Sequence, residues 1–156
     1  RIAYHQNRQY SLLCGIFRSP RFKREEAQIT AKAREALDLV GLADKSEHIA
    51  GSLPYGEQRR VEIARALMLS PKLLLLDEPA AGMNPQETQT LLELIRKLRD
   101  ELKITVLLIE HDMKLVMNLC EELFVLDYGH LIAKGDPKSI QSNERVVEAY
   151  LGGSWA

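Results

Sequence analysis

The sequence predicts an α/β fold in which parallel strands are flanked by helices, preceded by a mostly helical part. Residues 73–76 are four consecutive leucines, a continuous apolar run typical of a strand buried on both faces of a parallel sheet. A second apolar run follows at 104–109, after a segment with helical periodicity, which is the arrangement of a β-α-β crossover. We therefore expect a helical part over residues 1–70 and a sheet-containing part over residues 71–156.

The helical part is predicted from apolar residues that recur at helical spacing between turn residues. Gly41 stands where a left-handed helix cap is expected, and the Gly- and Pro-containing stretch 51–56 is predicted to be a loop. The next helix then begins almost at Gly56 and ends before Ser70-Pro71. The predicted helices cover residues 11–17, about 23–40 and about 56–67.

The second part alternates strands and helices. Pro85 suits the first turn of a helix, which continues through Leu91, Ile95, Leu98 and Leu102 to the second strand. The segment Tyr128-Gly129-His130 is predicted to be a tight turn between two strands. The remaining predicted elements are a helix around 113–120, strands at 123–126 and 131–133, and two short helices at 137–142 and 144–151.

Composition limits the functional class. The chain has 156 residues, 46% hydrophobic and 28% charged, with a net charge of −1, so it has no bulk electrostatic attraction to nucleic acid. Cys14 and Cys120 lie among apolar neighbours without metal or redox spacing, which predicts buried free thiols. The apolar runs are too short to cross a bilayer. We expect any membrane role to require a partner.

Three residues with catalytic potential are predicted at the carboxyl ends of strands, where ligands of open parallel sheets bind. Asp77 follows the leucine run and is suited to hold Mg²⁺, while Glu78 is suited to direct a water at a γ-phosphate. His111 follows the second strand and is suited to sense that phosphate. The alternatives are a polar strand end with a turn at 77–79, and a histidine bonded to backbone.

A helix that begins at Gly56 also offers an anion site at its positive end. The alternative is an ordinary loop followed by a solvated face that carries Arg59, Arg60 and Arg65. A complete phosphate-cradling loop requires glycine followed by lysine, and none of the nine glycines precedes a lysine. We therefore expect the phosphate-binding half of the site to lie outside this chain.

Four ordered segments together resemble the ATP-binding subunit of ABC transporters, and most closely the branched-chain amino acid permease type. The resemblance covers essentially the whole chain and implies a partial P-loop NTPase (ABC ATPase) core. It also places the start of the chain after the Walker A and glutamine loops, so Gln6 and Gln9 are not assigned to the latter. The segments are LPYGEQRRVEIARAL at 53–67, LLLLDEPAAGMNP at 73–85, LLIEHDM at 107–113 and FVLDYGHLIAKGDP at 124–137.

The resemblance implies a role for each motif. Residues 73–78 are similar to the Walker B strand, with Asp77 as the Mg²⁺ ligand and Glu78 as the catalytic glutamate, and His111 is similar to the switch histidine. The D-loop corresponds to residues 80–84, including Ala81, Gly82, Met83 and Asn84. The signature motif, which would contact ATP bound mainly to a second subunit, corresponds to Leu53, Pro54, Tyr55, Gly56, Glu57 and Gln58.

Two positions depart from the family pattern. Pro54 stands where the commonest signature has a serine that contacts the γ-phosphate, so that contact would have to come from N–H groups at Gly56 or be absent. Asn84 replaces the usual D-loop aspartate, which retains hydrogen bonding and removes a charge.

The resemblance implies an ATPase that uses ATP and Mg²⁺ and energises import, with branched-chain amino acids as the expected cargo. Its expected partners are a second ABC ATPase subunit, integral membrane permease subunits and, indirectly, an external solute-binding protein, with no nucleic acid. The expected location is peripheral, at the cytoplasmic face of the membrane. Two alternatives stay open: an ABC-type ATPase of DNA repair or translation, because fold and site do not fix the coupled task, and an inactive fragment.

Overall fold

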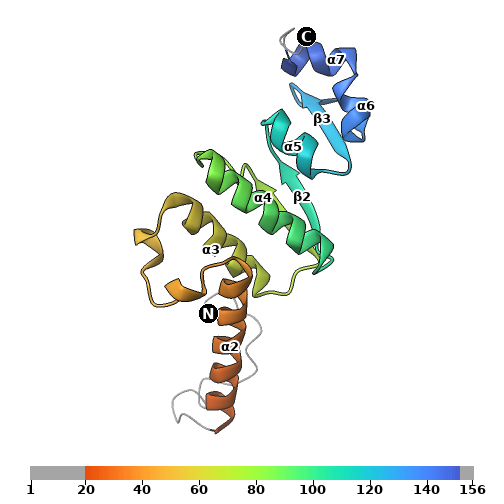
Figure 1. Cartoon of the computed structure of the whole chain (residues 1–156). Helices are drawn as coiled ribbons and strands as arrows, with labels where there is room; N and C mark the ends of the chain where they lie inside the picture. The colour runs from red at the N-terminus through yellow and green to blue at the C-terminus, as the bar shows by residue number, and fades with distance from the viewer. Residues whose placement is uncertain (1–19, 152–156) are drawn as a thin grey trace. The chain divides into compact units, whose positions relative to one another are not determined.

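A computed structural model describes residues 20–151, which form part of two compact units that meet in sequence between Leu108 and Ile109. The units are described separately, and Figure 1 shows the elements of each. The predicted helix at 11–17 and Cys14 lie outside the described residues. The first unit contains α2 (Pro20–Leu39), the 3₁₀ turns η2 (Ala43–Lys45) and η3 (Ala50–Ser52), α3 (Tyr55–Leu67), β1 (Leu73–Asp77), α4 (Pro85–Asp100) and most of β2 (Thr105–Ile109).

The predicted helix before Gly41 is confirmed as α2. Ile29 and Ala36 are buried on one face, as the helical spacing of apolar residues requires. Gly41 has φ of +70°, and its N–H donates to Asp38 O at 2.9 Å while the next N–H, of Leu42, donates to Leu37 O. A left-handed residue at this position is the usual helix end, and glycine adopts it without a Cβ penalty.

The helix predicted near Gly56 is confirmed as α3, which begins one residue earlier, at Tyr55. The preceding loop is not wholly irregular, because residues Ala50–Ser52 form the single turn η3. Ile63 and Ala64 are buried on α3. The Arg60 guanidinium donates to Val40 O at 2.8 Å, which ties α3 to the end of α2.

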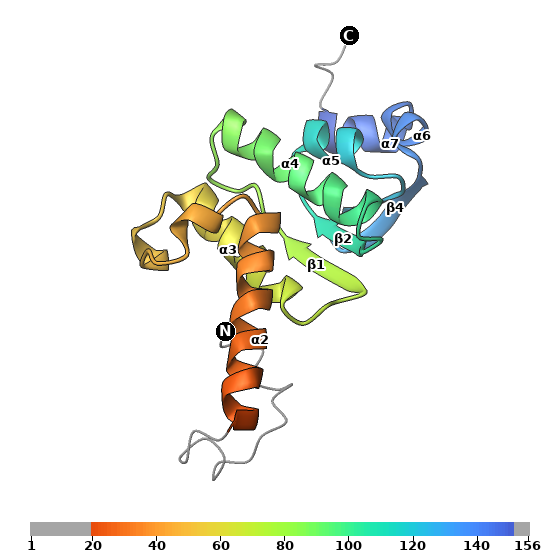
Figure 2. The ribbon, with the colours of Figure 1, turned by 60° about the horizontal axis from the view of Figure 1, so that its bottom comes forward.

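The β-α-β crossover is confirmed by β1, α4 and β2. Thr105 N–H donates to Lys72 O at 2.9 Å, so the two strands start side by side and run parallel as neighbours in a two-stranded sheet. Helix α4 follows β1 and precedes β2 in the chain, and all three elements are labelled in Figure 2. Its buried side chains form the centre of the core of this unit: Leu91, Leu92, Leu94, Ile95 and Leu98.

The prediction that the first strand is buried on both faces is wrong for the described structure. Leu74 is buried, but Leu73 and Leu75 are exposed, Leu75 by 65%. On β2, Leu107 and Ile109 are exposed as well. The alternation follows from strand geometry, because successive side chains point to opposite faces and the described chain covers only the face that bears Leu74. Leu102 also departs from prediction, since α4 ends at Asp100 and Leu102 is exposed.

The second unit is built on a hairpin. Strands β3 (Leu123–Asp127) and β4 (His130–Gly135) pair antiparallel, with Asp127 opposite His130. The predicted tight turn is confirmed, because Tyr128 and Gly129 have φ of +45° and +79°, as in a type I′ turn that matches strand twist. The helical elements of this unit are α5 (Met113–Leu119), α6 (Pro137–Gln141), α7 (Glu144–Val146) and the π-helical turn η4 (Val147–Leu151).

A small apolar cluster holds the second unit together. Val125, Ile140 and Val146 are buried at its centre, and Met113 and Met117 pack against them. Asp136 caps α6 by accepting N–H bonds from Lys138 and Ser139. Cys120 is only half-buried, so the prediction of a buried thiol is wrong there: the residue ends α5 instead of lying on its packed face.

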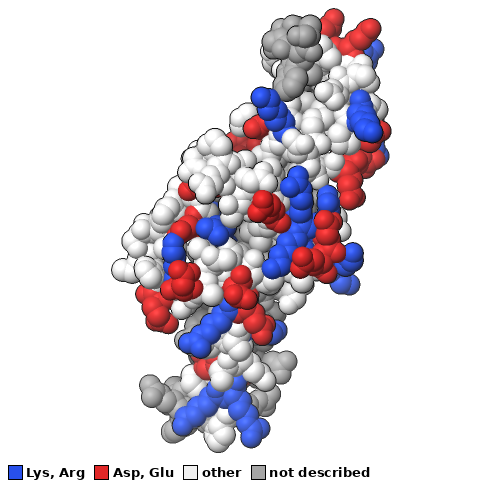
Figure 3. All heavy atoms as spheres, in the orientation of Figure 1, with Lys and Arg blue, Asp and Glu red and all other residues white. Residues whose placement is uncertain are grey.

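Charged residues of both signs are intermixed on the face drawn in Figure 3, in keeping with the near-neutral composition. None of the helices within residues 20–151 has the length and apolar composition that crossing a membrane requires.

Candidate functional site

The predicted acidic pair lies at the exposed carboxyl end of β1. Asp77 is the last residue of the strand and Glu78 follows it, and both are exposed. Glu78 has φ of +42°, a left-handed conformation that is uncommon for a residue with a Cβ. The N–H of Ala81 donates to Glu78 O at 3.1 Å. The chain thus turns sharply at Glu78, and the two adjacent carboxylates leave the strand from different backbone conformations.

Residues 80–84, the predicted D-loop, form a tight turn. Met83 N–H donates to Ala80 O at 3.1 Å, and Gly82 has φ of +75°, where glycine is favoured. Asn84 is the N-cap of α4, and its Oδ1 accepts the N–H groups of Gln86 at 3.0 Å and Glu87 at 2.9 Å. This is a capping role that asparagine and aspartate fill about equally well.

Glu87 completes a capping box at the same turn. Its Oε2 accepts the Asn84 N–H at 3.0 Å, so the two residues satisfy each other's backbone donors. Pro85 occupies the first helical position, where its missing N–H costs nothing. The sequence N-P-Q-E therefore fixes where α4 begins and holds the Glu87 side chain in place.

The predicted signature motif spans the loop before α3 and its first turn. Pro54 is the N-cap and makes no side-chain capping bond, while its carbonyl accepts the N–H groups of Glu57 and Gln58, each at 3.0 Å. Gln58 Nε2 donates to Leu53 O at 2.8 Å. Gly56 is buried. The absence of a capping oxygen leaves the N-terminal end of α3 without the side-chain acceptor that serine would supply.

Two charged contacts fix the first turn of α3. The Lys45 ammonium pairs with Glu57 Oε1, and Glu57 Oε2 is buried with no hydrogen-bond partner among the described residues. Arg59 Nε donates to Tyr55 Oη at 3.0 Å, and its guanidinium lies 5.2 Å from the centre of that ring. A hydrogen bond to Glu62 raises the pKa of Arg59. Arg59 and Arg60 are therefore both engaged in contacts, in contrast to a purely solvated face.

In the first unit, the predicted signature segment contacts both the predicted D-loop and the first turn of α4. A Cβ built on Gly56 would lie 2.8 Å from Cδ and Oε1 of Glu87, and one built on Gly82 would lie 3.5 Å from Cε1 of Tyr55. Sequence reasoning singled out Tyr55, Gly56 and Gly82 but missed Glu87. The signal available for Glu87 was its place three residues after Asn84, the capping-box spacing.

His111 belongs to the second unit, whereas Asp77 and Glu78 belong to the first. It is exposed and lies between the end of β2 and the start of α5. The next residue, Asp112, caps α5 by accepting the N–H groups of Lys114 at 2.9 Å and Leu115 at 3.2 Å. This cap fixes the point at which the chain leaves His111 and becomes helical.

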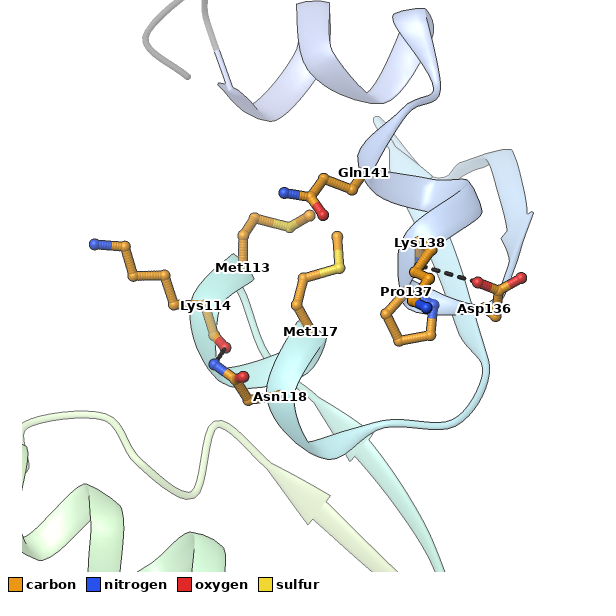
Figure 4. A pocket seen from close by; sticks show the side chains of 8 residues that line it. All are labelled: Met113, Lys114, Met117, Asn118, Asp136, Pro137, Lys138 and Gln141. Carbon is orange, nitrogen blue, oxygen red and sulfur yellow. Dashed lines mark hydrogen bonds between the residues drawn. The ribbon is translucent and has the colours of Figure 1, made fainter. Parts of the chain in front are cut away.

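A hollow of about 720 Å³ in the second unit lies between α5 and α6. The side chains of Met113 and Met117 extend into it, whereas Lys114 points away from them (Figure 4). Residues of the predicted site do not line this hollow. Its lining residues are Met113, Lys114, Met117, Asn118, Asp136, Pro137, Lys138 and Gln141.

The chain is similar to known proteins in both sequence and structure. Residues 4–81 match the family described as ABC transporter, and residues 130–156 match the family described as branched-chain amino acid ATP-binding cassette transporter. The chain is 47% identical over 151 residues to the high-affinity branched-chain amino acid transport ATP-binding protein BraF of Pseudomonas aeruginosa. It is 44% identical over 151 residues to the corresponding protein LivG of Escherichia coli.

Each of these alignments covers 97% of this chain and 59% of the relative. The chain thus spans about three-fifths of the length of the curated relatives it matches. Among solved structures, the ADP conformation of MJ1267, an ATP-binding cassette of an ABC transporter, superposes with a TM-score of 0.76 at 32% identity. That match covers 96% of this chain and 60% of the other.

Proposed function

Because the chain belongs to the ABC transporter ATP-binding family, we propose that it forms part of the ATP-hydrolysing subunit of an importer for branched-chain amino acids. The cargo class is supported by the match of residues 130–156 and by the similarity to BraF and LivG, which are named as branched-chain amino acid transport proteins. The complete subunit, in this proposal, contains this chain together with the part of its relatives' length that the chain does not span.

The observation that carries the proposal is the acidic pair at the end of β1. Asp77 and Glu78 are both exposed at the carboxyl end of a parallel strand, which is where ligands bind in open α/β sheets. Because Glu78 has a left-handed backbone conformation, its side chain leaves the backbone in a different direction from that of Asp77. Two adjacent carboxylates can thus take two tasks: Asp77 serves the metal, and Glu78 orients and deprotonates the water that attacks the γ-phosphate.

The residues present fit a magnesium ion shared with nucleotide. Among the described residues, no group of three or more His, Cys, Asp or Glu side chains could hold a metal by itself. Mg²⁺ at phosphate-transfer sites is usually bound by one or two carboxylates together with phosphate oxygens and water. The single exposed carboxylate of Asp77 fits that donor set. When bound, the ion would supply positive charge against the phosphate oxygens.

The signature segment serves a second nucleotide in this proposal. Helix α3 is 13 residues long and lacks a side-chain cap. The N–H groups of Glu57 and Gln58 bond Pro54 O, so it is the N–H groups of Tyr55 and Gly56, at the positive end of the helix, that suit a phosphate. That phosphate belongs to ATP held mainly by a second ABC ATPase subunit, and two nucleotides close the dimer. His111, in the separate role that the resemblance implies, contacts the γ-phosphate of the nucleotide held by its own subunit and reports whether that phosphate is present.

Dimer closure is coupled to transport through integral membrane permease subunits. An external solute-binding protein delivers the amino acid and acts on this chain only indirectly. The subunit works at the cytoplasmic face of the membrane as a peripheral protein. The similarity to an ABC transporter family and to transport ATP-binding proteins supports the permease partners. The solute-binding protein and the cytoplasmic face are expectations from the resemblance.

Amino-acid uptake by the reconstituted transporter tests the proposed function. Vesicles that contain the complete subunit and its permease partners should accumulate leucine, isoleucine or valine only with internal ATP. A Glu78→Gln subunit should assemble equally well and support no accumulation. ATP-dependent uptake that Glu78→Gln leaves intact would remove Glu78 from its role, and ATP hydrolysis without uptake of any of the three would overturn the cargo assignment.

A further inference from the structure

The start of α3 and the turn before α4 contact each other reciprocally in the first unit. Tyr55, from the signature segment, lies against the backbone of Gly82, where a Cβ would be 3.5 Å from its ring. Glu87, from α4, lies against the backbone of Gly56, where a Cβ would be 2.8 Å from Cδ and Oε1 and 3.0 Å from Cγ. Each segment thus presents a glycine to a side chain of the other.

The two contacts differ in how tightly they restrict the residues. The space at Gly82 allows an ordinary van der Waals contact with Tyr55, although its φ of +75° independently favours glycine. The space at Gly56 does not, because 2.8 Å is shorter than heavy atoms tolerate without displacement. Gly56 is also buried. Close approach of Glu87 is therefore a structural reason for glycine at position 56.

Glu87 is not a loosely held side chain that could move aside. Its Oε2 accepts the Asn84 N–H at 3.0 Å, and the Asn84 side chain accepts the Glu87 N–H at 2.9 Å. Moving the carboxylate away from Gly56 would break the reciprocal bond and leave the first turn of α4 less well capped. The capping box thus converts Glu87 into a fixed spacer between α4 and α3.

We propose that Glu87 is a positioning residue that couples the signature segment to the D-loop, so that the first turn of α3 and the turn at 80–84 move as one piece. The inference rests on the proposed function, in which these two segments act at nucleotide sites. A shift of the turn at 80–84 is transmitted through Asn84 and Glu87 to the backbone of Gly56, at the end of α3 that the proposed function assigns to a phosphate. Glu87 itself touches neither nucleotide nor water in this scheme.

A double-mutant cycle in the complete subunit tests the coupling. The variants are Gly56→Ala, Glu87→Ala and the two combined, with Glu87→Gln as the conservative replacement. Glu93→Ala is the matched control, because Glu93 is an exposed acid on the same helix that accepts a hydrogen bond from Gln89. The readouts are kcat and KM for ATP, and hydrogen exchange of the backbone amides at 55–58 and 80–87.

Gly56→Ala should lower kcat on the order of tenfold or more, because a displacement near 1 Å at a reacting site costs this much. Glu87→Ala should also lower kcat, with KM nearly unchanged. The double variant should be more active than Gly56→Ala alone, because the added Cβ then has room. Contacting residues show such non-additivity, whereas independent ones do not. Glu87→Gln, which keeps an acceptor for Asn84 N–H, should retain most of the activity.

If Glu87 only stabilises the fold, a different pattern is expected. It would change the folded fraction and leave kcat per folded molecule unchanged, and losses at positions 56 and 87 would multiply. Either result overturns the proposal. Hydrogen exchange that becomes faster at 80–87 but not at 55–58, in Gly56→Ala or in Glu87→Ala, also overturns it, because coupled segments should respond together. If the wild-type subunit hydrolyses no ATP, the proposed function fails, while the exchange cycle still decides whether residues 56 and 87 are coupled.

Discussion

Replacing Asn84 by alanine should destabilise the complete subunit by about 1 kcal/mol, because loss of a helix N-cap typically costs roughly 0.5–2 kcal/mol. The Asn84 side chain accepts two backbone N–H groups, from Gln86 and Glu87. Alanine leaves both donors to water. One bond of the capping box survives the substitution, because the donor to Glu87 Oε2 is the backbone N–H of residue 84. The expected cost is therefore in the middle of the range.

Thermal unfolding measures this cost. A loss of 1 kcal/mol corresponds to a decrease in Tm of about 2–4 °C for a domain of roughly 150–250 residues. Asn84→Asp should stay within about 1 °C of wild type, because aspartate caps as well as asparagine. Gln86→Ala is the matched control, since Gln86 is exposed and only its backbone enters the cap. The capping account is refuted if Gln86→Ala lowers Tm as much as Asn84→Ala.

Three further predictions concern the packing and charge of the described elements. Leu98→Ala, at a side chain with 0% exposure, should lower the free energy of unfolding in urea by about 2–5 kcal/mol. Leu102→Ala, at an exposed side chain, should lower it little, and equal losses for the two variants would contradict the packing. Gly41→Ala should destabilise by about 1 kcal/mol, because φ of +70° penalises a Cβ, and a rise in the urea midpoint would show that this strain is absent. Hydrogen bonds from Ser139 hold the pKa of Asp136 below its usual range. The backbone amides that Asp136 caps should therefore be protected from hydrogen exchange at neutral pH and lose this protection as pH falls below about 4. Protection that is unchanged down to pH 2 would exclude the ionised cap.

The sequence was sufficient for features that depend on neighbouring residues. The end of α2 at Gly41, the start of α4 at Pro85 and the turn at Tyr128-Gly129 were all predicted from turn and cap chemistry, and the structure confirms them. Each depends on the backbone preference of one or two residues. Such preferences act over a few positions and do not require knowledge of the rest of the chain.

Burial of the sheet could not be predicted in the same way. A run such as Leu73–Leu76 shows that both faces of a strand are apolar, but it does not identify what covers them. In the described structure, one face bears the buried Leu74, and the other bears the exposed Leu73 and Leu75. Exposed aliphatic side chains at this density on one sheet face mark a surface for contact with further protein.

The candidate site was predictable as a set of residues but not as a set of contacts. Asp77 and Glu78 were assigned from their place after the apolar strand, and the structure places both at its exposed end. Their roles stay predictions, as does that of His111. The left-handed backbone of Glu78 and the contact between Gly56 and Glu87 depend on how the chain folds between positions 56 and 87, which local patterns do not encode.

The central claim is that the acidic pair at the end of β1 serves ATP hydrolysis, and the most direct test is to measure Mg-ATP binding and turnover together in the complete subunit. Glu78→Gln should bind Mg-ATP with nearly wild-type affinity and hydrolyse it about 10²–10⁴-fold more slowly, as expected for loss of a general base. Asp77→Ala should lose the magnesium dependence of binding. Turnover by Glu78→Gln at the wild-type rate would contradict the claim.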